Sequence, residues 1–368
     1  MISWILGPES RFNTGIAKYS LELIDGMRKI SEKSIKIISF KDNGRPNSIL
    51  RYFWQFFTLP LKIIFFEKNN ELIIYQEAFI FLVIFRLFSN KKTITVIHHV
   101  PEENDRSKKG FYLKFLFSIL PKKNKNIVYI TPSEFTKNKL IYQYGVSELN
   151  VHVVYNIIES TDEEIAVGLN NNLNKLEKNF VDKIESYKRN GFTIVSNIGS
   201  FEDRKNVLIL VDVFNSLKLK SKKDNFLLVK VGFAIDENNK NKFISKCDEN
   251  EVNYAFLGDA SSDLINYVYS ASDIYVAPSR YEGFGRTVIE AQKRECLILA
   301  SKIAAHLEIL NNEVVFVDEI NNPTEWAEKI ITLDELQPID REKSIALGVS
   351  NTIKFNSVNV TKEFLKIL

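Results

Sequence analysis

Short apolar segments, separated by amphipathic ones, recur along the whole 368-residue chain. The apolar segments are continuous and rich in β-branched residues, which is typical of parallel strands that are buried on both faces. They read ISWIL, IKIISF, ELIIY, TITVIH, NIVYIT and VHVVY in the first half, and FTIVSNIG, NFLLVKVG, NYAFLG, DIYVAP, LILAS and EVVFV in the second. Helical periodicity between them is found at residues 14–30, 134–143, 204–219, 261–270 and 285–294, and residues 339–368 look helical throughout.

This alternation predicts an α/β fold in which parallel sheets carry helices on both faces. Because 368 residues suffice for two domains, we expect two Rossmann-like, doubly wound domains that face across a cleft. The polar, Asn-rich segment 159–190 interrupts the alternation and is predicted to be the interdomain segment. Residues 1–158 would then form the N-terminal domain and residues 191–352 the C-terminal domain. Residues 353–368 are predicted to form a last helix that can pack back on the N-terminal domain.

Several classes of protein are disfavoured by composition and motifs. Cys247 and Cys296 are the only cysteines, which argues against a disulfide framework and fits a reducing compartment. The first residues, MISWILGPESR, become polar too soon for a signal peptide, so we expect a cytoplasmic protein. The chain contains no C-x-x-C or H-E-x-x-H zinc motif, and no G-x-G-x-x-G follows the first predicted strand. A zinc site and a NAD-dependent dehydrogenase are therefore weak alternatives.

Positive charge is concentrated in the first half. Residues 1–159 carry 23 Lys and Arg against 14 Asp and Glu, a net charge of +9, whereas the remainder carries 26 against 32, a net charge of −6. A general Lys and Asn bias of the genome explains the Lys content equally well, but it explains the asymmetry less well. No nucleic-acid-binding motif accompanies the basic half, so no nucleic-acid partner is expected.

Segment 106–125, RSKKGFYLKFLFSILPKKNK, holds seven of these basic residues and no acidic one around an apolar centre. It is predicted either to bind an anionic membrane surface as a basic amphipathic helix or to pack into the core with solvated flanks. Segment 51–66, RYFWQFFTLPLKIIFF, adds aromatic surface that can lie beside it. Segment 78–88 is apolar but shorter than the ~20 residues that a membrane span needs, so we expect a buried helix there.

The segment PSRYEGFGRTVIEAQ, residues 278–292, follows a predicted strand and leads into a predicted helix. Gly283 and Gly285 let backbone N–H groups approach a ligand closely, and the helix adds its free N–H groups and positive dipole end. This arrangement is typical of a phosphate site. Glu282 and Glu290 flank it, and carboxylates beside a phosphate accept hydrogen bonds from sugar hydroxyls. Two glutamates eight residues apart are commonplace, but the glycines and the strand–loop–helix context favour a nucleotide-sugar site.

The same segment resembles the E-x7-E signature of glycosyltransferase family 4, a large family of retaining glycosyltransferases with the GT-B fold. IGSFEDRKNVLILVDVF, LLVKVG and LGDASSDLINYVYSASDIYVAPS resemble the parts of the family's second domain that precede the signature, and HLEIL resembles the turn that follows it. NTGIAKYSLELI, TVIHHVP, YITPSEFTKNKL and VVYNIIE resemble its first domain, and FNSVNVTKEFLKIL resembles its final helix. The resemblance covers nearly the full chain and is most specific in residues 254–310.

The resemblance implies roles for individual residues. Glu282 would contact hydroxyls of the transferred sugar and Glu290 the ribose of the nucleotide. Arg204 and Lys205 would neutralise the departing nucleoside diphosphate, so that no metal is needed. The family often has Arg where this chain has Ser200, a departure for which Arg204 can compensate. The residues that would face the donor sugar and diphosphate are Gly283, Phe284, Gly285, Arg286 and Thr287.

Two histidines and a glycine of the first half are further candidates. His98 and His99 follow a predicted strand, at the edge of the sheet where ligands of α/β proteins bind. The resemblance implies that His98 is the catalytic-site histidine that contacts the donor sugar, and His99 stands where the family often has Asp. Gly15 would let the first loop approach the donor phosphates, although an ordinary glycine at a helix entry explains it as well.

The resulting hypothesis is a retaining hexosyltransferase that moves a sugar from a GDP- or UDP-sugar to a hydroxyl of a glycan acceptor. The expected acceptor is a lipid-linked glycan in bacterial surface polysaccharide biosynthesis of the O-antigen or capsule type. The enzyme would then be peripherally associated with the inner face of the plasma membrane. The alternatives are another GT-B enzyme, either an inverting transferase or a sugar-nucleotide epimerase, and a non-catalytic sugar-nucleotide-binding subunit.

Overall fold

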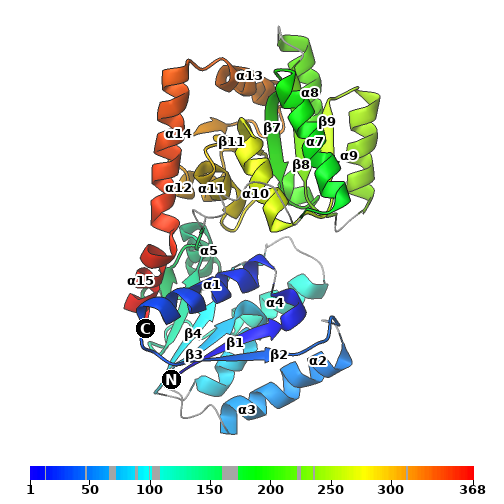
Figure 1. The fold of residues 1–368 in the computed structure, drawn as a ribbon. Coiled ribbons are helices and arrows are strands. Elements are labelled where there is room, and N and C mark those ends of the chain that lie inside the picture. The colour runs from blue at the N-terminus through cyan, green and yellow to red at the C-terminus, as the bar shows by residue number, and fades with distance from the viewer. Residues whose placement is uncertain are drawn as a thin grey trace. The chain divides into compact units, whose positions relative to one another are not determined.

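The chain forms two compact units in a computed structural model, which are shown in Figure 1. Unit 1 comprises residues 1–157 and 355–368, and unit 2 comprises residues 158–354. The structure describes every residue except 13, 46–47, 66–71, 88–89, 99, 102–107, 160–172, 222–224, 235–236 and 312–313, together with the side chains of 108 and 109.

Unit 1 is built on a six-stranded parallel sheet with the strand order β2-β1-β3-β4-β5-β6. Its strands β3 and β5 are buried along their whole length and β1 and β4 at all but one residue each, which explains why these sequences are almost continuously apolar. The strands are β1 (Ile2–Pro8), β2 (Ile35–Phe40), β3 (Leu72–Gln76), β4 (Lys92–Val96), β5 (Ile127–Thr131) and β6 (Val151–Val153).

Helices cover both faces of this sheet. The helices α3, α4 and α5 share one apolar cluster with one face of the sheet, whereas α1 and α15 share a second cluster with the other face. The α-helices are α1 (Gly15–Ile30), α2 (Ile49–Phe53), α3 (Leu59–Phe65), α4 (Lys108–Ser118), α5 (Glu134–Tyr144) and α15 (Ser357–Ile367). The 3-10 helices are η1 (Glu9–Arg11), η3 (Glu77–Arg86) and η4 (Glu148–Asn150), and η2 (Trp54–Thr58) is a π-helical segment between α2 and α3.

The helix α15 follows unit 2 in the chain but packs in unit 1. Its Thr361 lies against α1 at Gly26, where a Cβ would come within 2.2 Å of the Thr361 hydroxyl oxygen. Phe364 of the same helix is fully buried and stacks on Trp4 of β1, with ring centroids 5.6 Å apart. The chain therefore leaves unit 1, forms unit 2 and returns.

Unit 2 has a second six-stranded parallel sheet, with the order β12-β11-β10-β7-β8-β9. In this order β7 and β10 are neighbours, and the chain leaves them towards opposite halves of the sheet. Ligands of doubly wound folds bind at such a switch point, outside the carboxyl ends of the strands. The strands are β7 (Thr193–Ile198), β8 (Phe226–Val231), β9 (Tyr254–Leu257), β10 (Ile274–Ala277), β11 (Leu297–Ser301) and β12 (Val315–Val317).

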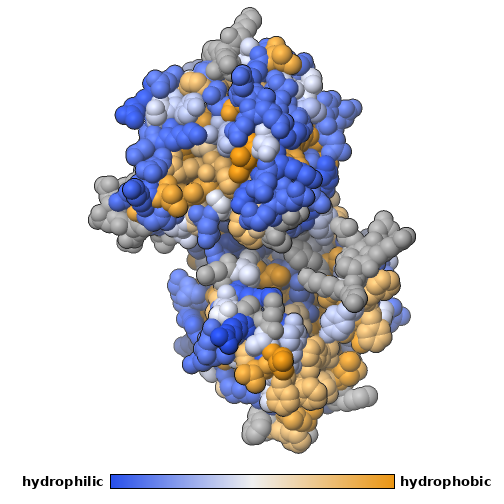
Figure 2. All heavy atoms as spheres, turned by 90° about the vertical axis from the view of Figure 1, so that its right-hand side faces the viewer, coloured by the Kyte–Doolittle hydropathy of each residue, from blue (hydrophilic) through white to orange (hydrophobic). Residues whose placement is uncertain are grey.

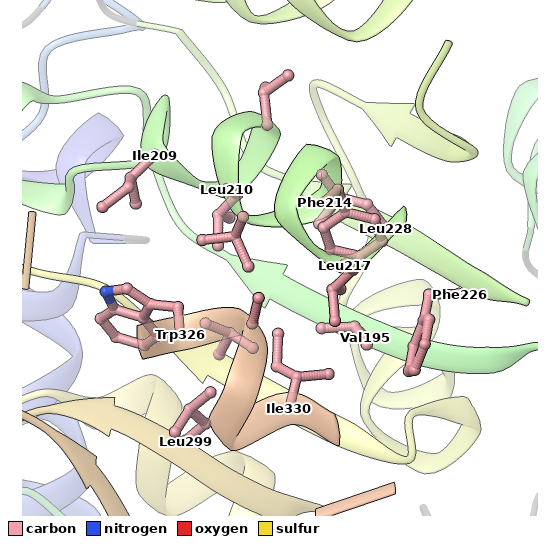
Figure 3. Packing of buried hydrophobic residues seen from close by; sticks show 14 of the residues in the cluster. Val195, Ile209, Leu210, Phe214, Leu217, Phe226, Leu228, Leu299, Trp326 and Ile330 are labelled. Carbon is pink, nitrogen blue, oxygen red and sulfur yellow. The ribbon is translucent and has the colours of Figure 1, made fainter. Parts of the chain in front are cut away.

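The sheet of unit 2 is also covered on both faces. Figure 3 shows one core, in which Phe214 of α8 and Trp326 and Ile330 of α13 pack over Val195 and Leu299 of the sheet. The helix α9 joins this cluster and α14 packs against it through Ile345, whereas α7, α10 and α11 contact the sheet outside it. The helices are α7 (Lys175–Arg189), η5 (Asp203–Lys205), α8 (Ile209–Lys220), α9 (Glu237–Glu249), α10 (Ser262–Ala271), α11 (Arg286–Lys293), α12 (Ala304–Ile309), α13 (Pro323–Asp334) and α14 (Pro338–Thr352), with η6 (Ile353–Phe355) at the boundary between the units.

The predicted fold class, two Rossmann-like parallel-sheet units, is confirmed, but two local predictions need correction in part. The helix predicted at 204–219 begins at Ile209, because Asn206 takes a left-handed φ of 52° and separates η5 from α8. The buried helix predicted within segment 78–88 is the 3-10 helix η3 (Glu77–Arg86), which buries Phe79, Ile80, Leu82 and Val83 but leaves Ile84 and Phe85 each 46% exposed. Among the described helices, none is both long and apolar enough to cross a bilayer.

Candidate functional site

A cavity opens at the switch point of the unit 2 sheet. The loop after β7 and the loop after β10 meet there, and they are joined by a backbone hydrogen bond from the Arg280 N–H to the Arg204 carbonyl at 2.8 Å. The cavity is lined by Asn197, Ile198, Gly199, Lys205, Tyr275, Ala277, Ser279, Glu282, Thr287 and His306. The predicted candidates Lys205, Glu282 and Thr287 are therefore brought together in one hollow.

Glu282 is a buried carboxylate, only 7% exposed, that is held by two cations. Lys205 Nζ donates to Oε1 at 2.5 Å, and Arg204 Nη1 donates to Oε2 at 3.0 Å. The Ser279 hydroxyl donates to Oε1 at 2.7 Å. Burial would raise the pKa of Glu282, but the charges of Lys205 and Arg204 outweigh it and hold that pKa at about 2. Glu282 is therefore ionised at neutral pH and accepts hydrogen bonds through both oxygens.

Arg204 is also tied to the loop that follows β7. Its Nε donates to Glu202 Oε2 at 2.6 Å, while the Ser200 hydroxyl donates to Glu202 Oε1 at 2.7 Å. Glu202 thus joins Arg204 to Ser200, the position at which the resembling family often has Arg. Both Arg204 and Lys205 lie on η5, before the first turn of α8.

The loop after β10 ends at Gly285, where the backbone conformation requires a glycine. Gly285 caps α11 with a φ of 94°, a left-handed conformation in which side chains other than that of glycine are strained. Phe284 before it is buried, and Arg286 and Thr287 after it form the first turn of α11. Gly283 takes no such positive φ. Of the two glycines in the segment, Gly285 therefore sets the entry into the helix.

Glu290 lies one turn further along α11 than Arg286. Its Oε2 accepts a hydrogen bond from the buried Tyr269 hydroxyl at 3.0 Å, and Arg286 Nε donates to Oε1 at 3.4 Å. Burial and the charge of Glu290 raise the pKa of Tyr269 far above its usual value, so this hydroxyl stays a donor. Because the Glu290 side chain is 29% exposed, it keeps access to a ligand.

The unit 1 candidates lie at the carboxyl edge of the other sheet. His98 follows β4, is 5% exposed, and its backbone N–H donates to Glu77 Oε2 at 2.8 Å. Its ring meets the Tyr19 ring edge-on, with centroids 4.9 Å apart. Gly15 begins α1, and a Cβ on it would meet no atom within 4 Å. His99 lies outside the described residues.

Comparison with known proteins assigns the chain to a class of enzyme. Residues 180–346 match the family model for glycosyl transferases group 1. The O-antigen chain mannosyltransferase RfbU of Salmonella typhimurium is 23% identical over 88% of both chains. The capsular polysaccharide biosynthesis glycosyltransferase CapH of Staphylococcus aureus is 27% identical over 67% of this chain and 63% of its own.

Solved structures agree on the fold. The Anabaena protein Alr3699/HepE, crystallised in complex with UDP and glucose, matches with a TM-score of 0.73 at 14% identity, over 100% of this chain and 99% of that one. A glycosyltransferase from Rickettsia africae matches with a TM-score of 0.71 at 20% identity, over 100% and 97%. The protein is a glycosyltransferase with the GT-B fold. Its matched segment, residues 180–346, contains every residue that lines the cavity of unit 2.

Two residues at the cavity of this glycosyltransferase were not predicted from its sequence. His306 carries no sequence motif, yet it is 1% exposed and lines the cavity with Glu282. Tyr275 lies within the predicted strand DIYVAP, and its hydroxyl donates to the Ile198 carbonyl at 3.1 Å and also interacts with Thr287. The rule that ligand sites lie at the carboxyl edge of a parallel sheet could have pointed to His306, which follows the end of β11.

The chemistry available in this cavity is that of hydrogen-bond acceptors beside cations. The described residues of the glycosyltransferase contain no group of three or more His, Cys, Asp or Glu side chains that could hold a metal ion. Positive charge at the cavity comes from Lys205 and Arg204, and bare backbone comes from Gly199 and Gly285.

Proposed function

We propose that this glycosyltransferase transfers a hexose from a nucleotide diphosphate sugar to a hydroxyl of a glycan acceptor, with retention of the anomeric configuration. The observation that carries the proposal is the buried, ionised Glu282 between two cations at the switch point of unit 2. The relatives named as O-antigen and capsular polysaccharide enzymes support a role in bacterial surface polysaccharide biosynthesis.

The donor is proposed to occupy the cavity of unit 2. Glu282 accepts hydrogen bonds from hydroxyls of the transferred sugar. Lys205 and Arg204 turn from the carboxylate towards the diphosphate, whose charge grows as the bond to the sugar breaks. The start of α11, which follows Gly285, adds backbone N–H groups on the same side. UDP and GDP are both candidate nucleotides, since the Anabaena structures contain UDP and two of the relatives are named mannosyltransferases.

The remaining residues of the E-x7-E-like segment bind the rest of the donor in this proposal. Glu290 accepts from the ribose hydroxyls, and the Tyr269 hydroxyl fixes one of its oxygens. The backbone of Gly283, Phe284 and Gly285 and the side chains of Arg286 and Thr287 face the donor sugar and the diphosphate. In unit 1, His98 contacts the donor sugar, and Gly15 lets the β1–α1 loop approach the phosphates.

Retention is proposed to follow from attack on the same face from which the diphosphate departs. The bond from the anomeric carbon to the phosphate oxygen breaks, the acceptor oxygen forms the new bond, and the departing phosphate oxygen takes the acceptor proton. The positive charge that this step needs is supplied by Lys205, Arg204 and the start of α11, so a metal-independent reaction is expected.

A lipid-linked acceptor is proposed because unit 1 presents apolar and basic surface together. The predicted segment 106–125 includes α4, which exposes Phe111 and Phe115 at 64% and 62%, and it ends in the exposed Lys122 and Lys123. A larger apolar surface lies on α2, η2 and α3, and Figure 2 shows hydrophobic side chains gathered on this unit. We therefore propose that this face meets an anionic membrane from the cytoplasmic side.

The direct test is donor turnover with the product followed by NMR. The wild type is incubated with UDP-glucose or GDP-mannose and a lipid-linked glycan acceptor, and the anomeric configuration of the new linkage is read from its coupling constant. Retention is expected, and Glu282→Gln should lower turnover about 100-fold or more, because the neutral amide keeps the shape but loses the charge. Glu328→Gln is the matched control, since Glu328 forms an exposed ion pair with Lys220 in the same unit.

Three outcomes would contradict the proposal. An inverted product would indicate an inverting GT-B transferase. A changed donor sugar without transfer would indicate an epimerase. Binding of the donor without any turnover would indicate a non-catalytic subunit.

A further inference from the structure

His306 lies against the loop that carries Glu282. It belongs to α12, five residues after Ser301 at the end of β11. A Cβ built on Gly285 would lie 3.4 Å from His306 Cδ2 and 3.6 Å from Nε2. The Cδ2–Nε2 edge of the ring therefore faces the bare backbone of the loop, beside the cavity that His306 and Glu282 both line.

The contacts of Nδ1, on the opposite edge of the ring, determine which of the two ring nitrogens carries the proton. His306 Nδ1 lies 2.9 Å from the Ser301 carbonyl oxygen, which can only accept. Nδ1 also lies 3.3 Å from the Ser301 hydroxyl, but that hydroxyl donates its proton to the Ser279 carbonyl at 2.5 Å. Nδ1 must therefore carry the proton, and Nε2 of the neutral ring carries a lone pair.

The surroundings also keep the ring neutral. Burial lowers the pKa of His306, and Lys205 lowers it further, against the opposing effects of Glu282 and the Ser301 carbonyl. Within the described parts of the chain, no donor is hydrogen-bonded to Nε2. The cavity thus holds a neutral imidazole acceptor beside the carboxylate acceptor of Glu282.

We propose that His306 Nε2 accepts a hydrogen bond from a hydroxyl of the transferred sugar and so helps to select the donor. This inference rests on the proposed nucleotide-sugar function of the cavity. A buried acceptor rejects an analogue that lacks the matching hydroxyl, because the acceptor is then left unpaired. The site therefore selects hexoses with a free hydroxyl at the position that meets His306, over sugars that are deoxygenated there.

Two substitutions distinguish the role of Nδ1 of His306 from the role of Nε2. In His306→Asn the side-chain amide can still donate to the Ser301 carbonyl, as Nδ1 does, but no atom remains near the position of Nε2. In His306→Gln the longer side chain can bring its amide oxygen towards the position of Nε2. The pair therefore tests the acceptor separately from the structural hydrogen bond.

Dissociation constants measured by calorimetry give the first readout. The probes are UDP-glucose and GDP-mannose, with UDP and GDP as the references that lack the sugar. For the nucleotide sugar that binds, His306→Asn should weaken affinity about tenfold while affinity for its nucleoside diphosphate stays unchanged, and His306→Gln should recover part of the loss. Equal weakening of both ligands, or no weakening of either, would overturn the inference.

Monodeoxy analogues of the same donor give the second readout. At one hydroxyl position the wild type should discriminate against the deoxy analogue about tenfold, and His306→Asn should bind the analogue and the parent equally. If no position loses its discrimination in His306→Asn, the inference is wrong even though the donor site stands. If the wild type binds neither the nucleotides nor the nucleotide sugars, the proposed function fails, and the inference falls with it.

Discussion

The two units share an architecture but differ in what they offer to partners. Unit 2 keeps its charged groups at the carboxyl edge of the sheet in a closed network around Glu282. Unit 1 instead exposes large apolar side chains over α2, η2 and α3, where Phe57 and Phe65 are 60% and 70% exposed. Among the described residues of unit 2, Phe233 is the only exposed Phe or Tyr. The difference supports the proposal that a charged ligand binds unit 2 and an apolar partner binds unit 1.

The largest effect is expected when a cation is removed from the unit 2 network, because this tests whether unit 2 binds the charged ligand. Lys205→Met should lower donor turnover about 1000-fold, since Lys205 is proposed to stabilise the departing diphosphate. Steady-state assays with the accepted nucleotide sugar measure this loss. Lys302→Met is the control, because Lys302 forms an exposed ion pair with Asp318 in the same unit. Equal activity of both variants would show that Lys205 serves only the fold.

The next largest effect is expected at Gly232, which lies close to the backbone of Gly199. A Cβ on Gly232 would lie 1.8 Å from the Gly199 carbonyl oxygen, and the φ of Gly232 is 148°. Gly232→Ala should therefore lower the free energy of unfolding by about 3 kcal/mol or more and disturb the loop after β7. Denaturant unfolding measures the loss. Gly7→Ala in unit 1, where a Cβ meets no atom within 4 Å, should change stability little.

Lowering the pH should destabilise the fold of unit 2, because Glu282 becomes protonated. The folded-state pKa of about 2 lies below the ordinary value of 4.5, so the ionised carboxylate stabilises the fold fully above pH 4.5. This contribution is lost as the pH falls towards 2, and about 2 kcal/mol should be gone by pH 3. Hydrogen exchange of unit 2 peptides at pH 5.5 and pH 3, corrected for intrinsic rates, measures it. In Glu282→Gln this pH-dependent loss should vanish, and a loss equal to that of the wild type would contradict the assignment.

The smallest effect is expected for membrane binding by the exposed apolar surface of unit 1. Replacing Phe57 and Phe65 by Ser should lower partitioning onto anionic vesicles about tenfold, because two exposed apolar side chains no longer enter the interface. Phe233→Ser in unit 2, where the side chain is 58% exposed, is the matched control and should leave partitioning unchanged. Vesicle sedimentation measures all three proteins. Unaltered binding of the unit 1 variant would exclude this surface as the membrane contact.

Much of the fold could be predicted from the sequence, because parallel strands buried on both faces leave a strong local pattern. All twelve apolar segments contain strands, and the order of the second sheet follows the doubly wound arrangement. The start of α8 could not be predicted, since it depends on the backbone of Asn206, a residue that tolerates left-handed φ. The roles given to Glu282, Glu290 and the other site residues stay predictions.

The partners of those residues were harder to foresee, because they depend on contacts between distant segments. Lys205 and Glu282 are 77 residues apart, and only the neighbouring positions of β7 and β10 bring them together. His306 carried no local motif, and its tautomer depends on Ser301 and Ser279 from two different strand ends. Aromatic surface on segment 51–66 was expected from its composition, but which of its side chains are exposed depends on how α2, η2 and α3 pack.

The return of α15 to unit 1 affects how the chain can fold during synthesis. Unit 2 is a continuous stretch, so it can complete its core as soon as residue 354 has left the ribosome. Unit 1 cannot, because Trp4 and the Gly26 face of α1 lack their cover until Phe364 and Thr361 emerge. The N-terminal half must therefore wait, with apolar surface uncovered, while nearly two hundred further residues are translated, and it is the part of the nascent protein most in need of a chaperone.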